Sequence, residues 1–573
     1  MSNATCKRAR KSRLQPYAWL GAGAVTLSLG AAMVGGTAIA FADTGTDSAS
    51  ASDSSATDTS SPKSSAGKNS ATRSSRRSAP DASAVTRQAR GRAAVAPPAA
   101  LTNVPKPAAA VSPRLSRGSK PSAAAASKST ASNSTAASQA SPAAVANPAA
   151  DPSYNMTSYL PATPIVPGAH VTLALEQIAA AKTDLNQETF GSGKVVAGVA
   201  AIGPQLFLSG SAFALEAWQT QMPKAQQRLA DAQGIPVMHQ IAQLNLQITM
   251  ALPTLAQVGL SGAALLMPLV NLLGASTATT ESLVSSARSN GKVYVSVPVT
   301  MKANTEPVVY ISVNGGKKVP VLVDTGSSGL VLTRDAVGAG DLGPATGTGT
   351  SGYSGGLTYD YTTYDTVVDF GGGAVTEPTS VNVVDAADAQ AFTDYLAPAG
   401  VVGVLGVGAN TAGPGPSIPT TSLPGELSDG FTLYQNRGLF GLRGVLIFGP
   451  NPYPVRVSVP GTPDAYVQVA INDGPKQDAN AIIDSGGVYG TLPAYLIGGG
   501  SSVPSGTKIS VYNGDGSVLL YTYTVGASDA PTVVDSGELM NTGYIPFQQG
   551  PVYINYAADA APGGIGSTDF VYH

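Results

Sequence analysis

The sequence predicts a mainly β protein, in which a two-lobed domain of strands follows a disordered spacer and a small helical region. Three observations lead to this fold class. From about residue 292 onward, short apolar runs with strand-like alternation are separated by turn residues. Two of these runs end on Asp, a hydroxyl residue and Gly, and they lie 160 residues apart, which is the spacing expected for one motif in each lobe. The region before residue 151 is too poor in apolar residues to form a core.

The N-terminus has the pattern of an export signal. Lys and Arg residues precede an apolar stretch from Ala18 to about Ile39, and "AFA" at 40–42 fits a cleavage site. We therefore expect a signal peptide over residues 1–42 and a secreted or cell-envelope protein; an uncleaved anchor is the alternative, because the stretch could span a bilayer. Cys6 is the single cysteine, so the mature chain would contain no disulfide, thiol nucleophile or cysteine metal site.

Residues 43–150 predict a disordered spacer. They consist mainly of Ser, Ala, Thr and Pro, and cannot bury enough apolar surface to offset the loss of chain entropy on folding. Between residues 63 and 128 there are 13 Lys or Arg and one acid. This charge favours a solvated tail, with contact to an anionic wall polymer or lipid surface as the alternative.

Residues 151–290 predict a helical linker or pro-region. Apolar residues recur there at helix-like spacing: Val171, Leu175, Ile178 and Leu185. No charged residue occurs from 232 to 280, and we expect Pro253 and Pro268 to divide this run into helices too short to span a membrane. We interpret them as buried helices packed on a neighbouring domain; an envelope-facing surface and a removable pro-segment are the alternatives.

Residues 291–573 predict the β domain, with lobes of roughly 291–450 and 451–573. The run "VVYISV", then "NGG", then "KKVPVLV" predicts a hairpin whose second strand ends at Asp324. A buried lone carboxylate is costly, so this aspartate needs a hydrogen-bonded cradle or a second carboxylate that shares its proton.

A second motif of the same kind begins at Asp484. The glycines of both motifs allow close approach of the backbone, and the hydroxyl residues can bond across to the opposite loop. A third such motif, at Asp535, is a competing partner, but only 38 residues follow it, too few to complete a lobe.

Other catalytic systems fit the sequence poorly. The three histidines are His170, His239 and His573, and only the last belongs to the strand-rich region, so neither a Ser-His-Asp hydrolase nor a histidine zinc site is expected. The Gly-rich "TGTGTSGYSGG" lacks the Lys and the following helix of a phosphate loop. We interpret this stretch as the tip of a hairpin.

With these two motifs, residues 292 to 573 resemble the pepsin-like aspartic proteases. The segment from Tyr364 to Val367 is similar to the strand that leaves the family's flap, which makes Tyr353 the flap tyrosine. "VVGVLGVG" at 401–408 resembles the segment behind the first catalytic loop. "MNTGYIPF" at 540–547 is the looser match in the second lobe, because Asn541 and Thr542 replace apolar residues.

The resemblance implies an aspartic endopeptidase in which Asp324 and Asp484 share a proton and activate a water molecule. Tyr353 would close over an extended peptide substrate. The resemblance also implies that the enzyme needs no metal or other cofactor, binds no nucleic acid and is a monomer. The residues that would support the two aspartates are Thr325, Gly326, Ser327, Ser485 and Gly486.

Gly487 departs from the family pattern. A Ser or Thr usually stands there and bonds the outer oxygen of the second aspartate, as Ser327 does in the first motif. Loss of this bond should raise the affinity of Asp484 for a proton. The glycine at position 487 and the shortened first lobe leave an alternative open, in which the protein is a catalytically weak, pepsin-like surface binding module.

The N-terminal half narrows the resemblance to the PecA-type mycobacterial aspartic proteases. Those relatives carry an N-terminal PE domain and cut PE domains from cell-surface lipases and from themselves. This chain has the predicted signal peptide in that place, which favours export through the general pathway. We therefore expect cell-envelope or secreted proteins as substrates, with PE-domain and other surface proteins as candidates.

Overall fold

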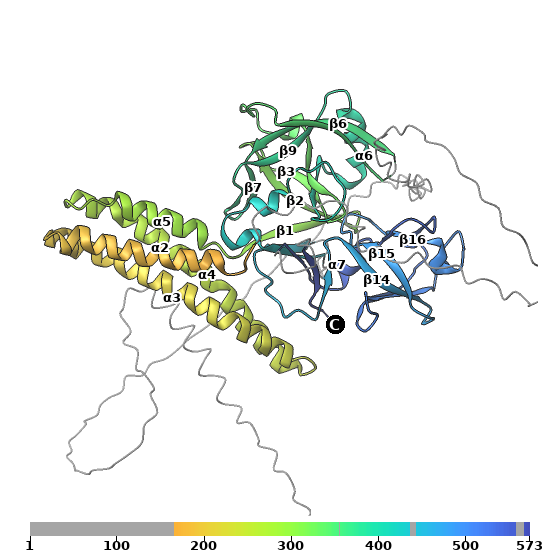
Figure 1. The fold of residues 1–573 in the computed structure, drawn as a ribbon, viewed down its shortest axis with the longest axis horizontal. Helices are drawn as coiled ribbons and strands as arrows, with labels where there is room; N and C mark the ends of the chain where they lie inside the picture. The colour runs from red at the N-terminus through yellow and green to blue at the C-terminus, as the bar shows by residue number, and fades with distance from the viewer. Residues whose placement is uncertain (1–164, 355, 436–442, 557–565, 573) are drawn as a thin grey trace, which may run out of the picture.

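The computed structural model describes residues 165–354, 356–435, 443–556 and 566–572. Long helices lie on one side of the molecule and two β-sheets on the other (Figure 1). The predicted signal peptide (1–42), Cys6 and the predicted spacer (43–150) lie outside the described residues.

Four long helices form the helical region, and they share a core of their own. Val171, Ile178 and Leu185 are fully buried on the first helix, as the spacing of apolar residues predicts, while Leu175 is partly buried against the same core. Small residues allow close packing between the two longest helices, where Gly259 lies against Ser211. The helices are α2 (Ala169–Asn186), α3 (Val195–Asp231), α4 (Pro236–Leu272) and α5 (Ala278–Asn290), with a π-turn η2 (Gln187–Gly191) after α2.

The expectation that Pro253 and Pro268 divide the apolar run is wrong. Helix α4 continues through both prolines for 37 residues. A proline inside a helix removes one hydrogen bond and costs about 3 kcal/mol or more. Here α4 packs along α3 and buries Pro253 together with Leu252 and Ala256, and tertiary packing of this kind supplies most of the stability of a helix.

Helices α3 and α4 are each long and apolar enough to cross a membrane, by length and composition alone. Core helices of soluble proteins have the same length and composition, and 33% of each apolar window is buried inside this structure. Their outward faces carry large exposed aliphatic side chains, including Leu206, Leu265 and Leu272.

The β domain consists of a 15-stranded and a 7-stranded sheet. The first sheet contains β1 (Val295–Lys302), β2 (Glu306–Val313), β3 (Val319–Asp324), β4 (Ser328–Thr333), β5 (Gly347–Tyr353), β6 (Leu357–Thr366), β7 (Val368–Gly371), β8 (Ala374–Val375), β9 (Thr379–Val384), β10 (Gly403–Val407), β11 (Gly430–Tyr434), β12 (Arg443–Phe448), β13 (Val457–Pro460), β21 (Val552–Asn555) and β22 (Ser567–Phe570). The second contains β14 (Asp464–Ile471), β15 (Gln477–Ile482), β16 (Thr491–Pro493), β17 (Lys508–Asn513), β18 (Leu519–Thr524), β19 (Thr532–Val534) and β20 (Met540–Asn541).

Short helices fill the connections between strands. They are η3 (Arg334–Ala336), α6 (Ala389–Leu396), η4 (Ala397–Ala399), η5 (Pro419–Ser422), η6 (Gly425–Ser428), η7 (Ala494–Ile497) and α7 (Ile545–Gln549).

The order of strands shows how the two halves of the β domain are connected through the first sheet. The expected hairpin is present, since β2 and β3 pair antiparallel. The chain then builds β4 to β12, forms the second sheet from β14 to β20, and returns to the first sheet through β21 and β22. These two strands lie between β11 and β13, so the last strands of the chain join the two halves.

Hydrogen bonds help to attach the helical region to the β domain. The backbone N–H groups of Gly168 and Val171, at the start of α2, each donate a 2.9 Å hydrogen bond to the Glu426 carboxylate on η6. Farther along, the Gln226 amide on α3 donates to the carbonyl of Asn451 at 2.7 Å. These contacts hold the helices on the side of the β domain away from β6 and α6 (Figure 1).

Candidate active site

Each predicted catalytic aspartate lies at or just after the end of a strand that has a parallel partner. Strand β3, with Val321 and Val323 fully buried, ends on Asp324, and β10 runs parallel to it with Gly406 beside the aspartate. In the second sheet β15 ends two residues before Asp484, and β20 runs parallel to it. Paired strands therefore hold both loops, and the carboxyls lie where these strands end.

The two loops are joined by four reciprocal hydrogen bonds between lobes. The Thr325 hydroxyl donates to the carbonyl of Ile483 at 2.6 Å, and the Ser485 hydroxyl donates to the carbonyl of Val323 at 2.8 Å. In return, the backbone N–H of Ser485 donates to the Thr325 hydroxyl at 2.8 Å, and that of Thr325 donates to the Ser485 hydroxyl at 3.1 Å. Both hydroxyl residues are completely buried, so these bonds lock the loops in register.

The two carboxyls lie against each other's glycine. A Cβ on Gly326 would stand 2.5 Å from Asp484 Cγ, and one on Gly486 would stand 2.9 Å from Asp324 Oδ1. Each glycine N–H donates to Oδ1 of the aspartate in its own loop, at 2.9 Å for Gly326 and 2.8 Å for Gly486. Glycine is therefore required in both motifs for space, and both aspartates are only 8% exposed.

The electrostatics favour one shared proton. Burial, and then the neighbouring charge of Asp484, raise the pKa of Asp324 well above its usual value, while hydrogen bonds from Ser327 and Gly326 oppose this. Two carboxyls this close cannot both ionise easily, which is the behaviour the paired-aspartate chemistry needs.

The outer oxygens are bonded differently in the two lobes. Ser327 donates its hydroxyl to Asp324 Oδ2 at 2.5 Å. The expected loss of the corresponding bond at Gly487 does not occur, because the Asn541 amide donates to Asp484 Oδ2 at 2.6 Å. Asn541 and Gly487 both depart from the family pattern, which was a signal in the sequence that this bond had changed. The two residues are 54 positions apart, so the sequence alone could not show that they are in contact.

Tyr353 lies at the tip of the β5–β6 hairpin, paired with Leu357. Its ring stacks on Tyr359, with 5.7 Å between centroids, and on Tyr395 of α6, with 6.2 Å. Burial and then the nearby Tyr359 raise the pKa of Tyr353 well above its usual value, and Asp324 adds to this. The tyrosine therefore stays protonated close to the first aspartate, and sequence reasoning missed its two aromatic supports.

Asp464 on β14 is a third buried carboxyl near the pair. Burial, and then the charge of Asp484, raise the pKa of Asp464 to about 7. Sequence reasoning missed this residue, because Asp464 belongs to none of the Asp-hydroxyl-Gly motifs.

The competing candidates lie elsewhere. Asp535 follows β19 and is exposed, with open space around Gly537, whereas Asp484 is buried beside Asp324. His170 and His239 belong to the helical region, and His573 lies outside the described residues. Within the described ranges no group of three or more His, Cys, Asp or Glu could hold a metal ion.

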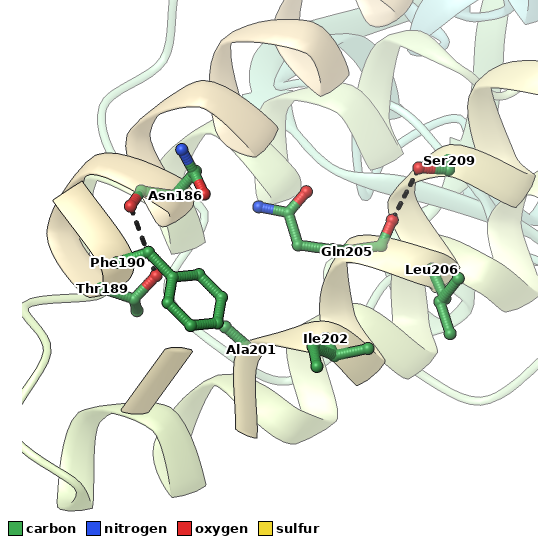
Figure 2. Close-up of a pocket in the computed structure, with 8 residues that line it drawn as sticks. All are labelled: Asn186, Thr189, Phe190, Ala201, Ile202, Gln205, Leu206 and Ser209. Carbon is green, nitrogen blue, oxygen red and sulfur yellow. Dashed lines mark hydrogen bonds between the residues drawn. The ribbon is translucent and has the colours of Figure 1, made fainter. Parts of the chain in front are cut away.

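A separate pocket of about 150 Å³ lies in the helical region, between the end of α2 and α3 (Figure 2). It carries no ionisable side chain, so it offers no acid, base or metal ligand. Its lining consists of Asn186, Thr189, Phe190, Ala201, Ile202, Gln205, Leu206 and Ser209.

Residues 295–568 match the family described as the PE-PGRS C-terminal aspartyl peptidase-like domain. The β domain is therefore similar to these aspartyl peptidase-like domains. Two curated proteins, both named PE cleavage protein A, match with high identity. The one from Mycobacterium tuberculosis is 44% identical over 298 residues, covering 48% of this chain and 51% of that protein. The one from Mycobacterium marinum is 43% identical over the same length, covering 52% of that protein.

The chain spans about half the length of these curated relatives. Two solved structures are also similar over 49% of this chain, each with a TM-score of 0.34. The aspartic proteinase from Irpex lacteus is 17% identical with 97% of its chain covered, and Basic 7S globulin from soybean is 12% identical with 95% covered.

The family match and the two-sheet architecture confirm the predicted fold class, a mainly β, pepsin-like domain preceded by a helical region. The same family and the two named relatives support an aspartic protease role for the β domain.

Proposed function

We propose that this protein is an exported aspartic endopeptidase, with Asp324 and Asp484 as its paired catalytic carboxyls. The observation that carries the proposal is the junction of the two loops, where Thr325 and Ser485 bond across the lobes and hold both carboxyls together in a buried site. Such an arrangement is costly unless the carboxyls share a proton, so its presence supports catalysis.

The chemistry is an addition of water followed by loss of an amine. One ionised carboxyl accepts a proton from a water molecule held between the pair, and the water oxygen forms a bond to the peptide carbonyl carbon. The protonated carboxyl donates a hydrogen bond to the developing oxyanion. The C–N bond then breaks, and the proton taken from water reaches the leaving nitrogen, which returns the pair to its singly protonated state.

The substrate would be an extended peptide segment of another protein. The β5–β6 hairpin, with Tyr353 at its tip, would cover this segment and exclude water during the reaction. The name of the relatives, PE cleavage protein A, supports PE-domain proteins as candidates among secreted or cell-envelope substrates. The predicted signal peptide supports export, and the excess of acids in the β domain, 23 Asp or Glu against 10 Lys or Arg from residue 291, disfavours nucleic acid as a partner. A monomer remains the expected state.

The helical region would act as a resident domain and not as a pro-segment that blocks the cleft. Its bonds to Glu426 and Asn451 hold it on the side of the β domain away from β6 and α6. The alternative of a weak binding module loses its main support, because Asn541 supplies the bond that Gly487 cannot.

The test is cleavage of a peptide library and of purified PE-domain fusion proteins by the full chain, across pH 3 to 7. The expected result is cleavage at discrete peptide bonds that a statine-type transition-state analogue blocks. A folded protein that cleaves neither substrate class at any pH, and does not bind the analogue, would contradict the proposal.

A further inference from the structure

The two lobes repeat the same pairing of a catalytic strand with a parallel partner strand. In the first lobe Leu322, two residues before Asp324, pairs with Val404. In the second lobe Ile482, two residues before Asp484, pairs with Asn541. Asn541 therefore occupies the lobe-equivalent position of Val404, a buried apolar residue that is 2% exposed. A polar residue at such a position needs a partner.

The partner is the carboxylate that lacks a hydroxyl donor. Gly487 occupies the lobe-equivalent position of Ser327, so its loop offers no side-chain bond to the outer oxygen of Asp484. A Cβ on Gly487 would overlap the Asn541 side-chain oxygen and stand 2.7 Å from Asp484 Oδ2. The glycine thus leaves the space that the Asn541 amide needs to reach the carboxylate.

The orientation of the Asn541 amide is set by a second bond. Its Oδ1 accepts a hydrogen bond from the backbone N–H of Gly543 at 2.8 Å, and this turns Nδ2 towards Asp484 Oδ2, 2.6 Å away. The backbone N–H of Asn541 donates to the Thr491 hydroxyl at 3.0 Å, which fixes the strand itself. The amide is held in one orientation from both ends.

We infer that Asn541 is a positioning residue for the catalytic pair, supplying in the second lobe the hydrogen bond that the Ser327 hydroxyl supplies in the first. This inference rests on the proposed function for its catalytic consequence. An amide N–H only donates, and a hydrogen bond to the ionised form of a carboxyl favours that form. Asn541 therefore orients the Asp484 carboxyl through its outer oxygen, as Ser327 orients Asp324.

The test compares the parent with Asn541→Ala, Asn541→Val and Gly487→Ser variants, and with the double variant Gly487→Ser/Asn541→Val. Loss of a hydrogen bond to a charged group should lower kcat by roughly 10- to 100-fold and move the acid limb of the pH profile upward by about one unit. Gly487→Ser alone should also lose activity, because its side chain displaces the amide. The double variant copies the first lobe, with a hydroxyl beside the carboxylate and Val behind it, and should recover at least about tenfold over Asn541→Val.

A matched control separates positioning from stability. Thr491→Val removes the acceptor for the Asn541 backbone N–H but touches no carboxyl oxygen, so it should lower the melting temperature and leave the acid limb unchanged. The inference is wrong if the parent cleaves and Asn541→Ala keeps both its kcat and its acid limb, or if the double variant is no better than the single ones.

A readout independent of cleavage keeps the inference testable if the proposed function fails. Aspartate labelled with ¹³C at the carboxyl carbon can be titrated by NMR in the full chain, parent and Asn541→Ala. The pair should titrate about one pH unit higher in the variant. Identical titration curves would overturn the role of Asn541 whatever the activity of the parent.

Discussion

A second pair of buried carboxyls, Glu426 and Asp429, lies where helix α2 meets the β domain. Glu426 is fully buried and accepts the N–H groups of Gly168 and Val171 at the start of the helix. Burial, and then the adjoining Glu426, raise the pKa of Asp429 to about 9, and Asp429 is only 1% exposed. Asp429 thus keeps its proton in the folded protein, while the Glu426 side chain accepts the N–H groups at the start of α2.

Asp429→Asn should stabilise the protein, increasingly so as the pH rises. The folded-state pKa lies above the unfolded value, so the folded protein holds a proton that the unfolded chain releases between about pH 4 and pH 9. Each pH unit in this window costs the parent about 1.4 kcal/mol of unfolding free energy. Asparagine does not titrate, so the variant loses no stability through this position as the pH rises. The advantage of the variant should grow from near zero at pH 4 to roughly 4 kcal/mol at pH 7.

The assay is urea unfolding of parent and variant at several pH values between 4 and 8. Fluorescence of Trp218 reports on the interface, because its ring packs against Tyr294 at 6.0 Å. Asp473→Asn is the control, since that carboxylate is 69% exposed in a surface ion pair with Lys508. Parent and variant curves that stay parallel with pH, or a variant that is less stable at pH 7, would refute the reasoning.

Substitutions at two further residues test the loops and the hairpin of the candidate site. Thr325→Val leaves the carbonyl of Ile483 and the N–H of Ser485 without partners, and should cost about 1 to 3 kcal/mol with a loss of cleavage; an unchanged melting temperature would contradict this. Tyr353→Ala removes the ring that stacks on Tyr359 and Tyr395, and should lower kcat/KM by about 100-fold, whereas Tyr353→Phe keeps the stacking and should lose less. Equal losses in the two Tyr353 variants, measured by steady-state cleavage, would refute the role of the ring.

Local patterns of the sequence were sufficient to predict that residues 291–573 form a β domain with two aspartate loops. Alternation and turn residues predicted the β2–β3 hairpin that ends on Asp324, and the repeated motif predicted a second aspartate in the other half of the domain. Each of these features is predicted by residues within about ten positions of it. Such features are predictable because the alternation of a strand and the residues of a turn determine the local structure directly.

Features that depend on distant residues could not be predicted. Proline is normally a helix breaker, and α4 continues through Pro253 because its packing along α3 stabilises the whole helix. In the sequence, Asn541 is recognisable only as a departure from the family pattern. Its role becomes visible only in the fold, which places it beside Asp484. Glu426 gave no local signal, because the helix that it caps begins 257 residues earlier.

The most direct test of the central claim is the cleavage rate of Asp324→Asn and Asp484→Asn beside Asp535→Asn, each in the full chain. The paired-carboxyl account predicts that either of the first two substitutions removes cleavage while leaving the melting curve close to that of the parent. It also predicts that Asp535→Asn, at an exposed position, cleaves as the parent does. Full activity in Asp484→Asn, or loss of activity in Asp535→Asn without unfolding, would contradict the assignment of the pair.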